Sequence, residues 1–464
     1  MFRFLHRNVL LPVFEGGIKG RKTFRYWKEL EQSQWLSPGE LERLQFGALC
    51  RLLAHAAAHC PYYAEDWAER GLDPAGLSAP EDFRRWPVID RVVIAEHRPR
   101  MRSRAPGLRL LSKSTGGSSG SPVHFDLDTG SNDRRMAAWH RGYDWAGAGP
   151  GTRQFYLWGV PLGQQPRWKR WKDQLYNRLY RRLVVNSFEF SDARVPLFLD
   201  QLNRQRPDVI VAYTGPLYTF ARCLKERQLE PYSPRSIVVG AEKLHPFQRE
   251  LIEDVFCAPV FETYGSREFM LIGAECDRHE GLHLTAEHLL VEILDDDGRP
   301  TPEVEEVNVV VTDLYNYGMP FIRYANGDRA PAGWGTCSCG RGLPTMSKVV
   351  GRRLDVLQTP DGRRIPGEFF PHLLKDFPAV RQFQIVQEEP ERVLLCVVLK
   401  GPWGEGDRER LDQEVRNVLG PETRFEVLAV DDIPLTSAGK HLVVVNRCGQ
   451  AASPARIPSG HAQG

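Results

Sequence analysis

A run of serines and glycines at residues 114–120 is the first segment whose side chains suit phosphate chemistry. Its glycines let the backbone turn tightly and point N–H groups inward, and its hydroxyls add further hydrogen-bond donors. It lacks the Gly-Lys-Ser/Thr ending of a P-loop, which argues against a Walker-type nucleoside triphosphatase. Taken alone, a flexible linker explains this composition equally well. The residues are Ser114, Thr115, Gly116, Gly117, Ser118, Ser119 and Gly120.

Three later motifs add carboxylates and cations. The sequence YGSRE at 264–268 ends an apolar run and would place Glu268 beside a bound cation or phosphate. Asp328 follows an Asn-Gly turn, and its carboxylate could accept both hydroxyls of a ribose. Gly351-Arg352 lies where the chain changes character, and Lys440, on a Gly-containing loop, is a mobile positive charge suited to a phosphate. Each of these motifs alone is explained by an ordinary solvated turn.

Together and in this order, the four motifs resemble those of the AMP-forming adenylating superfamily, which includes acyl-coenzyme A synthetases and peptide-synthetase adenylation domains. Within it, the chain most resembles phenylacetate–coenzyme A ligase and its capsule-biosynthesis (CapK-like) relatives. Gly240-Ala241-Glu242, the form YGSRE at 264–268 and the sequence CSCGRGLP at 337–344 carry this likeness. It runs from about residue 35 to residue 447.

The resemblance implies a role for each matched residue. Lys440 and Glu268 would be catalytic, the lysine bridging the substrate carboxylate and the α-phosphate of ATP and the glutamate holding Mg²⁺. Asp355 would be the hinge about which a small domain rotates between two reaction steps. The nucleotide would be bound by residues 114–120 at its phosphates and, at its adenine and ribose, by Gly240, Ala241, Glu242, Tyr264, Gly265, Asp328 and Arg352.

The implied reaction is the ATP-dependent activation of a carboxylic acid as an acyl-adenylate, with release of pyrophosphate and then transfer to a thiol, coenzyme A being favoured. Transfer to an amine or to a carrier-protein thiol is the alternative. Ser121 stands where relatives often carry a lysine, and Arg267 replaces a small hydroxyl residue. These departures would suit a further alternative, an inactive homologue that only binds nucleotide. A zinc-stabilised scaffold with a glycine-rich linker is the remaining reading.

Aromatic residues near predicted strand ends suggest the acid pocket. Tyr156, Trp158, Tyr213 and Gly215 would line it, which suits an aryl or medium-sized apolar acid. Aromatic side chains near strands are more often part of the core, and that is the competing interpretation.

Two cysteine-containing segments suggest a metal site. Cys276 and His279 follow the YGSRE motif, and Cys337 and Cys339 form a Cys-x-Cys pair further along the chain. Three thiolates and one imidazole make a closed tetrahedral set for a structural Zn²⁺. The competing reading is three unrelated cysteines and a surface histidine.

The elements that must position these residues are predicted from hydrophobic periodicity. Ser37-Pro38-Gly39-Glu40 has the form of a helix start, and helical spacing continues to Cys60. Apolar runs at 155–158, 209–213, 237–239 and 260–264 alternate with amphipathic stretches, as in parallel α/β units. Residues 289–294 and 307–312 read as paired antiparallel strands. Residues 380–400 and 424–430 read as strands that flank a helix at 407–419.

The expected fold class is therefore α/β: a large N-terminal adenylation domain (1–353) with α/β sheets, and a small, mobile α+β C-terminal domain (354–448). A tail of small and polar residues (449–464) is expected to be disordered.

Length and composition bound the remaining possibilities. The 464 residues exceed one ordinary core, and the net charge of only +2 argues against a dedicated nucleic-acid binder. No apolar stretch is long enough to span a bilayer. The first twenty residues, broken by Pro12, are expected to be a structured or surface-lying segment that would serve a homodimer as readily as a membrane surface. Nine scattered cysteines make no disulfide framework, so we expect a cytoplasmic protein.

Overall fold

The computed structural model describes residues 2–114, 123–158, 167–187, 194–300, 307–347, 349, 351–352, 356–361, 364–366, 369–374, 377, 379–434 and 442–448. They divide into two compact units, residues 2–349 and residues 351–448. The boundary expected at residues 353–354 and the tail from residue 449 lie outside the described residues.

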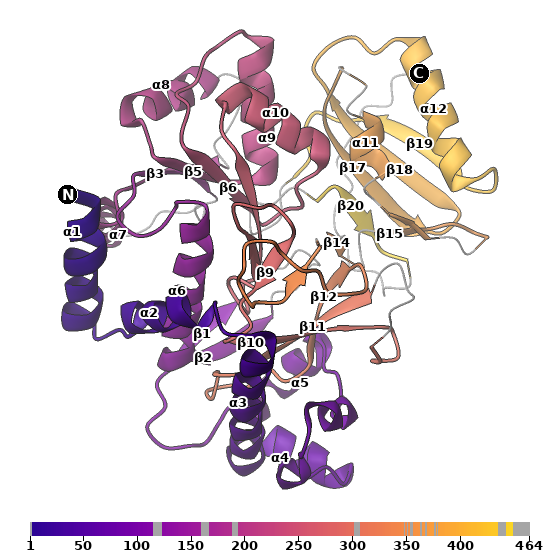
Figure 1. Ribbon diagram of the computed structural model, residues 1–464. Helices are drawn as coiled ribbons and strands as arrows, with labels where there is room; N and C mark the ends of the chain where they lie inside the picture. The colour runs from indigo at the N-terminus through magenta and orange to yellow at the C-terminus, as the bar shows by residue number, and fades with distance from the viewer. Residues whose placement is uncertain are drawn as a thin grey trace. The chain divides into compact units, whose positions relative to one another are not determined.

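Helices make up the amino-terminal third of the first unit (Figure 1). They begin with a nearly continuous helical run over residues 2–18, which includes two π-helical segments. The predicted helix start at Ser37 is confirmed: α3 begins at Pro38, and the backbone N–H of Ser37 donates to Oε2 of Glu40 at 2.8 Å in a capping box. The elements are α1 (Phe2–Leu5), η1 (His6–Leu10), η2 (Val13–Ile18), α2 (Thr23–Ser33), α3 (Pro38–His59), α4 (Pro61–Glu69), η3 (Pro74–Gly76), η4 (Pro80–Arg85) and α5 (Arg91–Met101).

An eight-stranded sheet forms the centre of the first unit (Figure 1). Its strands lie in the order β13-β9-β8-β7-β6-β5-β3-β4. The neighbours among β7, β6, β5, β3 and β4 pair in parallel, and the neighbours among β13, β9, β8 and β7 pair antiparallel. The predicted runs at 155–158, 209–213, 237–239 and 260–264 are the strands β3, β5, β6 and β7. The strands are β3 (Gln154–Trp158), β4 (Arg182–Asn186), β5 (Val209–Tyr213), β6 (Ser236–Gly240), β7 (Val260–Tyr264), β8 (Gly273–Glu275), β9 (Leu282–Leu284) and β13 (Thr345–Met346).

Both faces of the parallel strands are covered. Alternate side chains of β5 point to opposite faces, so Ile210 packs in the core beneath α8, α9 and α10, whereas Val211 packs in the core that includes Tyr143 of α6. The chain passes from β3 outward to β4 and returns to β5 on the other side of β3. This reversal makes the carboxyl ends of β3 and β5 a topological switch point, where α/β sheets bind ligands. The helices are α6 (Thr129–Trp145), α7 (Arg167–Leu179), α8 (Val195–Gln205), α9 (Thr214–Glu226) and α10 (Pro246–Phe256).

Two antiparallel sheets complete the first unit. The predicted pair at 289–294 and 307–312 is confirmed as β10 (Leu289–Leu294) and β11 (Val307–Asp313), and β11 also pairs with β12 (Tyr324–Ala330). A hairpin of β1 (Leu110–Ser114) and β2 (His124–Asp128) flanks residues 115–122. Within the described ranges, no helix is long and apolar enough to cross a membrane.

The second unit contains a mixed four-stranded sheet in the order β19-β18-β17-β20, together with helices, as expected of a small α+β domain. Its central pair, β17 and β18, is antiparallel, and the two outer pairs are parallel. The apolar side of α12, with Leu411, Val415 and Leu419, is buried in the same core as residues of β17 and β18. The predicted stretch at 380–400 is two strands that turn back on each other after Glu389. The elements are β14 (Gly351–Arg352), β15 (Val356–Gln358), β16 (Arg364–Pro366), α11 (Phe369–Leu374), β17 (Val380–Glu389), β18 (Arg392–Leu399), α12 (Glu405–Leu419), β19 (Arg424–Ala429) and β20 (Val444–Asn446). The α/β fold class predicted from the sequence is confirmed.

Candidate functional site

The last residue of β7 makes the central contact of the candidate site. The hydroxyl of Tyr264 donates to Oδ2 of Asp328 at 2.9 Å and accepts from the amide of Asn326 at 2.7 Å. The same amide lies 2.9 Å from Oδ2 of Asp328. Tyr264 and Asp328 are both buried, and they come from different sheets. The structure thus brings together two residues that lie 64 positions apart and that are both predicted from the sequence to bind the nucleotide.

The loop after Tyr264 turns so tightly that it requires glycine. A Cβ at Gly265 would lie 1.8 Å from the carbonyl oxygen of Met270, and Met270 itself adopts a positive φ of 70°. This turn carries Glu268, which is only 8% exposed. The hydroxyl of Tyr324 donates to Oε1 of Glu268 at 3.4 Å, and burial together with the Glu268 charge raises the pKa of Tyr324 well above its usual range. The tight turn and the Tyr324 hydroxyl therefore hold Glu268 as a buried side chain.

A buried arginine supports the same loop. Nη2 of Arg135, on α6, donates to the carbonyl oxygen of Arg267 at 2.6 Å. Burial lowers the pKa of Arg135 to about 10, opposed by the charges of Asp313 and Glu268. Sequence reasoning missed Arg135, because its surroundings read as an ordinary helix with no local motif.

Lys113 is a second cation that the sequence did not reveal. It immediately precedes Ser114, the last residue of β1, and its Nζ donates to Oδ1 of Asn132 at 2.9 Å. Burial lowers the pKa of Lys113 to about 8, helped by the positive charges of Arg135 and Arg267. The start of the Ser/Gly-rich segment is thus bordered by buried positive charge.

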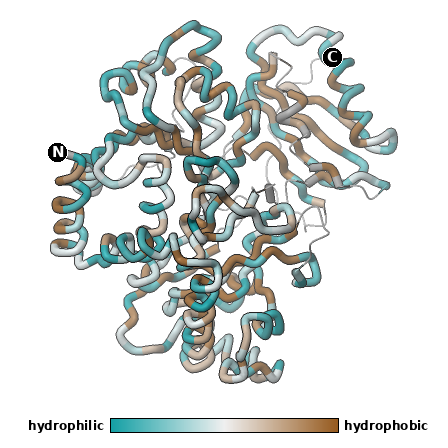
Figure 2. Tube along the Cα trace, viewed as in Figure 1, coloured by the Kyte–Doolittle hydropathy of each residue, from teal (hydrophilic) through white to brown (hydrophobic). Residues whose placement is uncertain are grey.

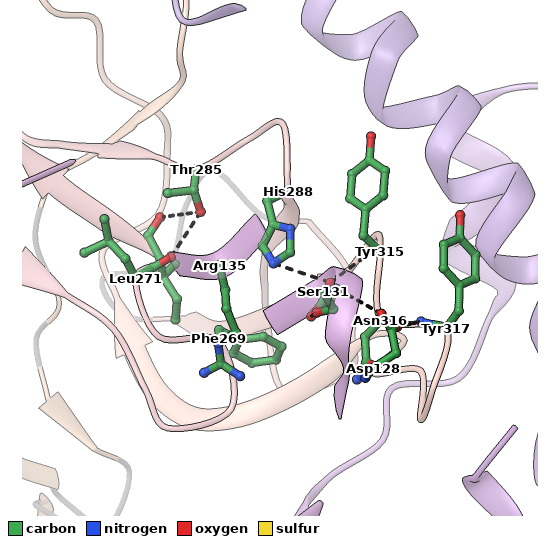
Figure 3. A network of polar contacts seen from close by, with 12 residues as sticks. Asp128, Ser131, Arg135, Phe269, Leu271, Thr285, His288, Tyr315, Asn316 and Tyr317 are labelled. Atoms are coloured by element: carbon green, nitrogen blue, oxygen red, sulfur yellow. Dashed lines mark hydrogen bonds and ion pairs between the residues drawn. The ribbon is translucent and has the colours of Figure 1, made fainter. Parts of the chain in front are cut away.

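Polar contacts fix the start of α6 against the loop that follows β11 (Figure 3). Ser131 donates to Oδ2 of Asp313 at 3.0 Å, and Oδ2 of Asp128 accepts from the backbone N–H groups of Tyr317 at 2.8 Å and Gly318 at 3.2 Å. Within the same network, the hydroxyl of Thr285 donates to the carbonyl oxygen of Leu271 at 3.1 Å. These bonds hold α6, and with it Arg135, in a fixed position.

The Gly240-Ala241-Glu242 turn follows β6. A Cβ at Gly240 would lie 2.5 Å from Oγ1 of Thr263, and Ala241 has a positive φ of 68°. Oε2 of Glu242 accepts from the backbone N–H of Gly215 at 2.6 Å, so this carboxylate caps the first turn of α9. The turn proposed to line the adenine is therefore bonded directly to the segment after β5.

The aromatic residues predicted to line the acid pocket lie in two different environments. The rings of Trp158 and Tyr213, at the carboxyl ends of β3 and β5, lie 4.2 Å apart at the topological switch point. Burial raises the pKa of Tyr213 to about 12, with a further contribution from the Glu242 charge. Tyr156 instead packs in the core beside α6, and the guanidinium of Arg182 lies 5.2 Å from its ring. The competing interpretation, a core aromatic, therefore describes the packing of Tyr156.

Several predicted site residues lie outside the described residues. They are Thr115, Gly116, Gly117, Ser118, Ser119, Gly120, Asp355 and Lys440, to which Ser121 is added. Arg352 is described only as part of the backbone of β14. Their roles remain predictions.

A cluster of three sulfurs and one imidazole lies beside the β8–β9 hairpin. The ligand atoms of Cys276, His283, Cys337 and Cys339 all lie within 4.8 Å of one another. Sγ of Cys276 is 3.6 Å from Sγ of Cys337, and Sγ of Cys339 is 3.3 Å from Nε2 of His283. Ligand atoms at the corners of a tetrahedron around Zn²⁺, each about 2.3 Å from the metal, are separated from one another by about 3.8 Å. The donor set therefore fits this ion.

The fourth member of this cluster is His283 and not the predicted His279. His279 sits in a turn with a positive φ of 54°, and its Nδ1 lies 3.1 Å from Oε2 of Glu275. His283 is the central residue of β9, which the hairpin brings back beside Cys276. Burial lowers the pKa of His283 to about 4, helped by the charge of Arg341, so the imidazole is neutral.

Comparisons with known proteins show which proteins the chain resembles in sequence and in fold. The family model for the CapK C-terminal domain matches residues 357–447. A phenylacetate–coenzyme A ligase of Thermus thermophilus is 26% identical over 446 residues, which cover 89% of this chain and 98% of the relative. Protein CapK of Staphylococcus aureus is 20% identical over 465 residues, covering 95% and 97% of the two chains. A solved structure of 2-hydroxyisobutyryl-coenzyme A ligase, in the postadenylation state with an acyl-AMP, aligns with a TM-score of 0.70 and 20% identity, covering 89% of this chain and 90% of that one.

The fold is thus that of an adenylate-forming ligase, with a large domain and a C-terminal domain. The full-length sequence relatives narrow the assignment further. The similarity over most of the chain to phenylacetate–coenzyme A ligases and to a CapK protein, with the CapK C-terminal match at residues 357–447, supports the AMP-forming superfamily and this branch of it.

Proposed function

We propose that the protein is an AMP-forming ligase that activates a carboxylic acid with ATP, releases pyrophosphate, and transfers the acyl group to the thiol of coenzyme A. The observation that carries this proposal is the buried Tyr264–Asp328–Asn326 cluster at the carboxyl end of β7. It presents a fixed carboxylate of the kind that accepts hydrogen bonds from a ribose. The full-length relatives named as coenzyme A ligases support the same reaction.

In this proposal, the chain's own residues position the nucleotide and concentrate positive charge. Asp328 and Arg352 hold the ribose, the turn at 240–242 lies along the adenine, and the 114–120 segment wraps the phosphates. Glu268 would hold Mg²⁺, which neutralises phosphate charge when bound. Preorganised charge of this kind supplies most of the catalysis in phosphoryl and adenylyl transfer.

A half-buried lysine and a buried arginine would replace the lysine that the loop lacks at Ser121. Lys113 directly precedes the segment, and Arg135 holds the backbone beside Glu268. We infer that they strengthen binding of the phosphate chain. Lys440 would then supply the mobile charge that bridges the carboxylate and the α-phosphate, with the C-terminal unit turning about Asp355 between the two steps.

The acid is proposed to be an aryl or medium-sized apolar acid. Trp158 and Tyr213 lie together at the switch point, with their rings tilted by 48° to each other, and Gly215 follows Tyr213 by two residues along the chain. An amine or a carrier-protein thiol is the alternative acceptor.

We further propose that Cys276, His283, Cys337 and Cys339 hold a structural Zn²⁺. With three thiolates and one imidazole, a tetrahedral site has no open position, so the ion would join the β8–β9 hairpin to the segment around residue 338. The backbone N–H and the hydroxyl of Ser338 both donate to Glu280, at 2.6 and 2.9 Å, and this brings the two segments together.

Release of pyrophosphate tests the proposed reaction. The protein is incubated with ATP, Mg²⁺ and a panel of aryl, fatty and amino acids, with and without coenzyme A. We expect release that requires an acid and is sustained by coenzyme A, and a loss on the order of 10²–10³ in the adenylation rate for Lys440→Ala. Acid-dependent release that is indifferent to coenzyme A would favour the amine or carrier-protein acceptor. An unchanged rate in Lys440→Ala would refute the assignment, and no release with any acid would favour the inactive homologue.

A further inference from the structure

The helical run over residues 2–18 has an unusual distribution of side chains. Two of its charged residues turn inward, whereas Arg3 is exposed: Arg7 pairs with Asp144 at 2.8 Å, and Glu15, only 2% exposed, pairs with Arg21 at 3.0 Å. Its outward face is apolar. A surface helix normally shows the reverse arrangement. The exposed apolar residues of this run are Phe4 (70%), Leu5 (44%), Val9 (44%), Leu10 (40%), Val13 (59%) and Ile18 (73%).

Helix α7 lies beside this run and extends the apolar surface. The ring centroids of Phe14 and Tyr176 are 6.3 Å apart, and Nζ of Lys19 lies 4.1 Å from the centroid of Tyr176. Trp168 and Trp171 are both 67% exposed. With Leu175, 54% exposed, they occupy positions i, i+3 and i+7 and so form one stripe along α7.

We call residues 2–18 and α7 together the N-terminal face. Nine of the seventeen large apolar side chains that are exposed in the described part of the chain belong to it. Figure 2 shows hydrophobic segments along the outer helix at the amino terminus. Apolar surface gathered in this way marks an interaction site, whereas scattered exposed residues need no explanation.

The segments that carry this face are rich in basic residues, some of which pair with acidic residues of neighbouring segments: Arg3 and Arg7 with Asp144, and Arg7 also with Glu31. Residues 2–28 and 167–179 together contain twelve Lys and Arg and only two acidic residues, whereas the whole chain contains 61 and 59. A groove of about 510 Å³ beside the apolar run is lined by Arg21, Arg25 and Lys28 among others. Its acidic residue, Glu29, pairs with Arg25 at 3.1 Å.

This chemistry selects one partner. In a symmetric dimer of this face, the basic residues of one copy would oppose the same residues of the other, which is unfavourable. A lipid surface instead matches both properties at once: tryptophans and aliphatic side chains enter the headgroup region, and basic side chains contact anionic lipid.

We propose that the N-terminal face binds the surface of membranes that contain anionic phospholipid, with its helices lying in the interface. This inference is independent of the proposed ligase reaction.

Cosedimentation of the full chain with vesicles tests the proposal. We expect binding to vesicles of phosphatidylcholine with about 30 mol% phosphatidylglycerol, little binding to pure phosphatidylcholine, and release by salt. The double variant Trp168→Gln, Trp171→Gln should bind about tenfold more weakly. Trp334→Gln, which removes a tryptophan that is 50% exposed elsewhere, should bind like the parent protein.

Circular dichroism melting identifies any variant that is simply unfolded, and Val13→Glu provides a second, independent change in the same face. The proposal is overturned if the parent protein binds neither vesicle, or if the Trp168/Trp171 variant and Val13→Glu, both folded, bind as the parent does. It is also overturned if the parent instead forms a dimer, detected by sedimentation velocity, that these substitutions abolish.

Discussion

Substituting Asp328 by asparagine probes the central carboxylate with little change in shape. Tyr264 and Asn326 both donate to Oδ2 of Asp328, at 2.9 Å each. In Asp328→Asn these two donors would fix the amide oxygen on their own side, so the NH₂ group would occupy the place of Oδ1. A ribose hydroxyl that reaches this side would then lose a charged acceptor.

The expected loss follows from the value of a hydrogen bond to a charged group, about 1.5–3 kcal/mol. It corresponds to roughly 10- to 150-fold weaker binding of AMP. Isothermal titration calorimetry measures it without knowledge of the acid substrate. The same titrations use 2′,3′-dideoxy-AMP, which lacks both hydroxyls.

The comparison of the two nucleotides makes the prediction specific. The parent protein should prefer AMP to the dideoxy nucleotide, and Asp328→Asn should lose most of this preference. Asp297→Asn, a change in an exposed turn, should keep it. If Asp328→Asn weakens both nucleotides equally, or neither, the proposed ribose contact is refuted.

Three further predictions concern the turn, the cation beside the phosphates and the metal. Gly265→Ala forces a Cβ against a backbone carbonyl at 1.8 Å, so its melting temperature should fall by several degrees, whereas Gly76→Ala, with nothing within 4 Å, should melt like the parent. Lys113, with a pKa of about 8, is charged below that pH; ATP affinity should therefore fall as pH rises from about 7 to 9, and Lys113→Met should bind weakly and without this pH dependence. In metal analysis, His283→Ala should lose zinc and His279→Ala should keep about one ion per chain; the reverse result would restore the assignment made from the sequence.

The strands and the nucleotide motifs were predictable because each depends on local sequence. Apolar runs with turn residues at their ends predicted β5 and β7 with correct bounds, and Ser37 with Glu40 predicted the start of α3. The four ordered motifs were sufficient for the family assignment. These features need no knowledge of how distant segments meet.

The sequence predictions and the structure differ where a residue's contacts depend on how distant segments pack together. The sequence favours His279 as the fourth metal ligand because it follows Cys276 closely. In the structure, the turn places its ring against Glu275, and the β8–β9 hairpin brings His283 to the cysteine sulfurs instead. The contact of Arg135 with the loop after β7 could not be predicted from the sequence, because it forms only when α6 packs against that loop. Tyr156 shows a different limit: an aromatic residue near a strand end fits a pocket or a core equally well in the sequence, and only the structure shows that it packs with Tyr143 and Val211.

The hydrogen bond between Glu242 and Gly215 constrains how substrate preference can be changed, whether by natural selection or by directed evolution. Any side chain at Gly215 would place its Cβ 2.7 Å from Oε2 of Glu242, so the carboxylate would have to shift and its hydrogen bond to the backbone N–H of Gly215 would be disturbed. In the proposed ligase, a mutation that reshapes the acid pocket at Gly215 would also disturb Glu242 in the turn proposed to line the adenine, so acid preference and ATP binding would change together at this position. Tyr213 pairs along the main chain with Gly240, at the start of the same turn, whereas Trp158 pairs with Asn186 of β4. In the proposed ligase, Trp158 is therefore the position at which a mutant library could broaden the range of acids while sparing nucleotide binding.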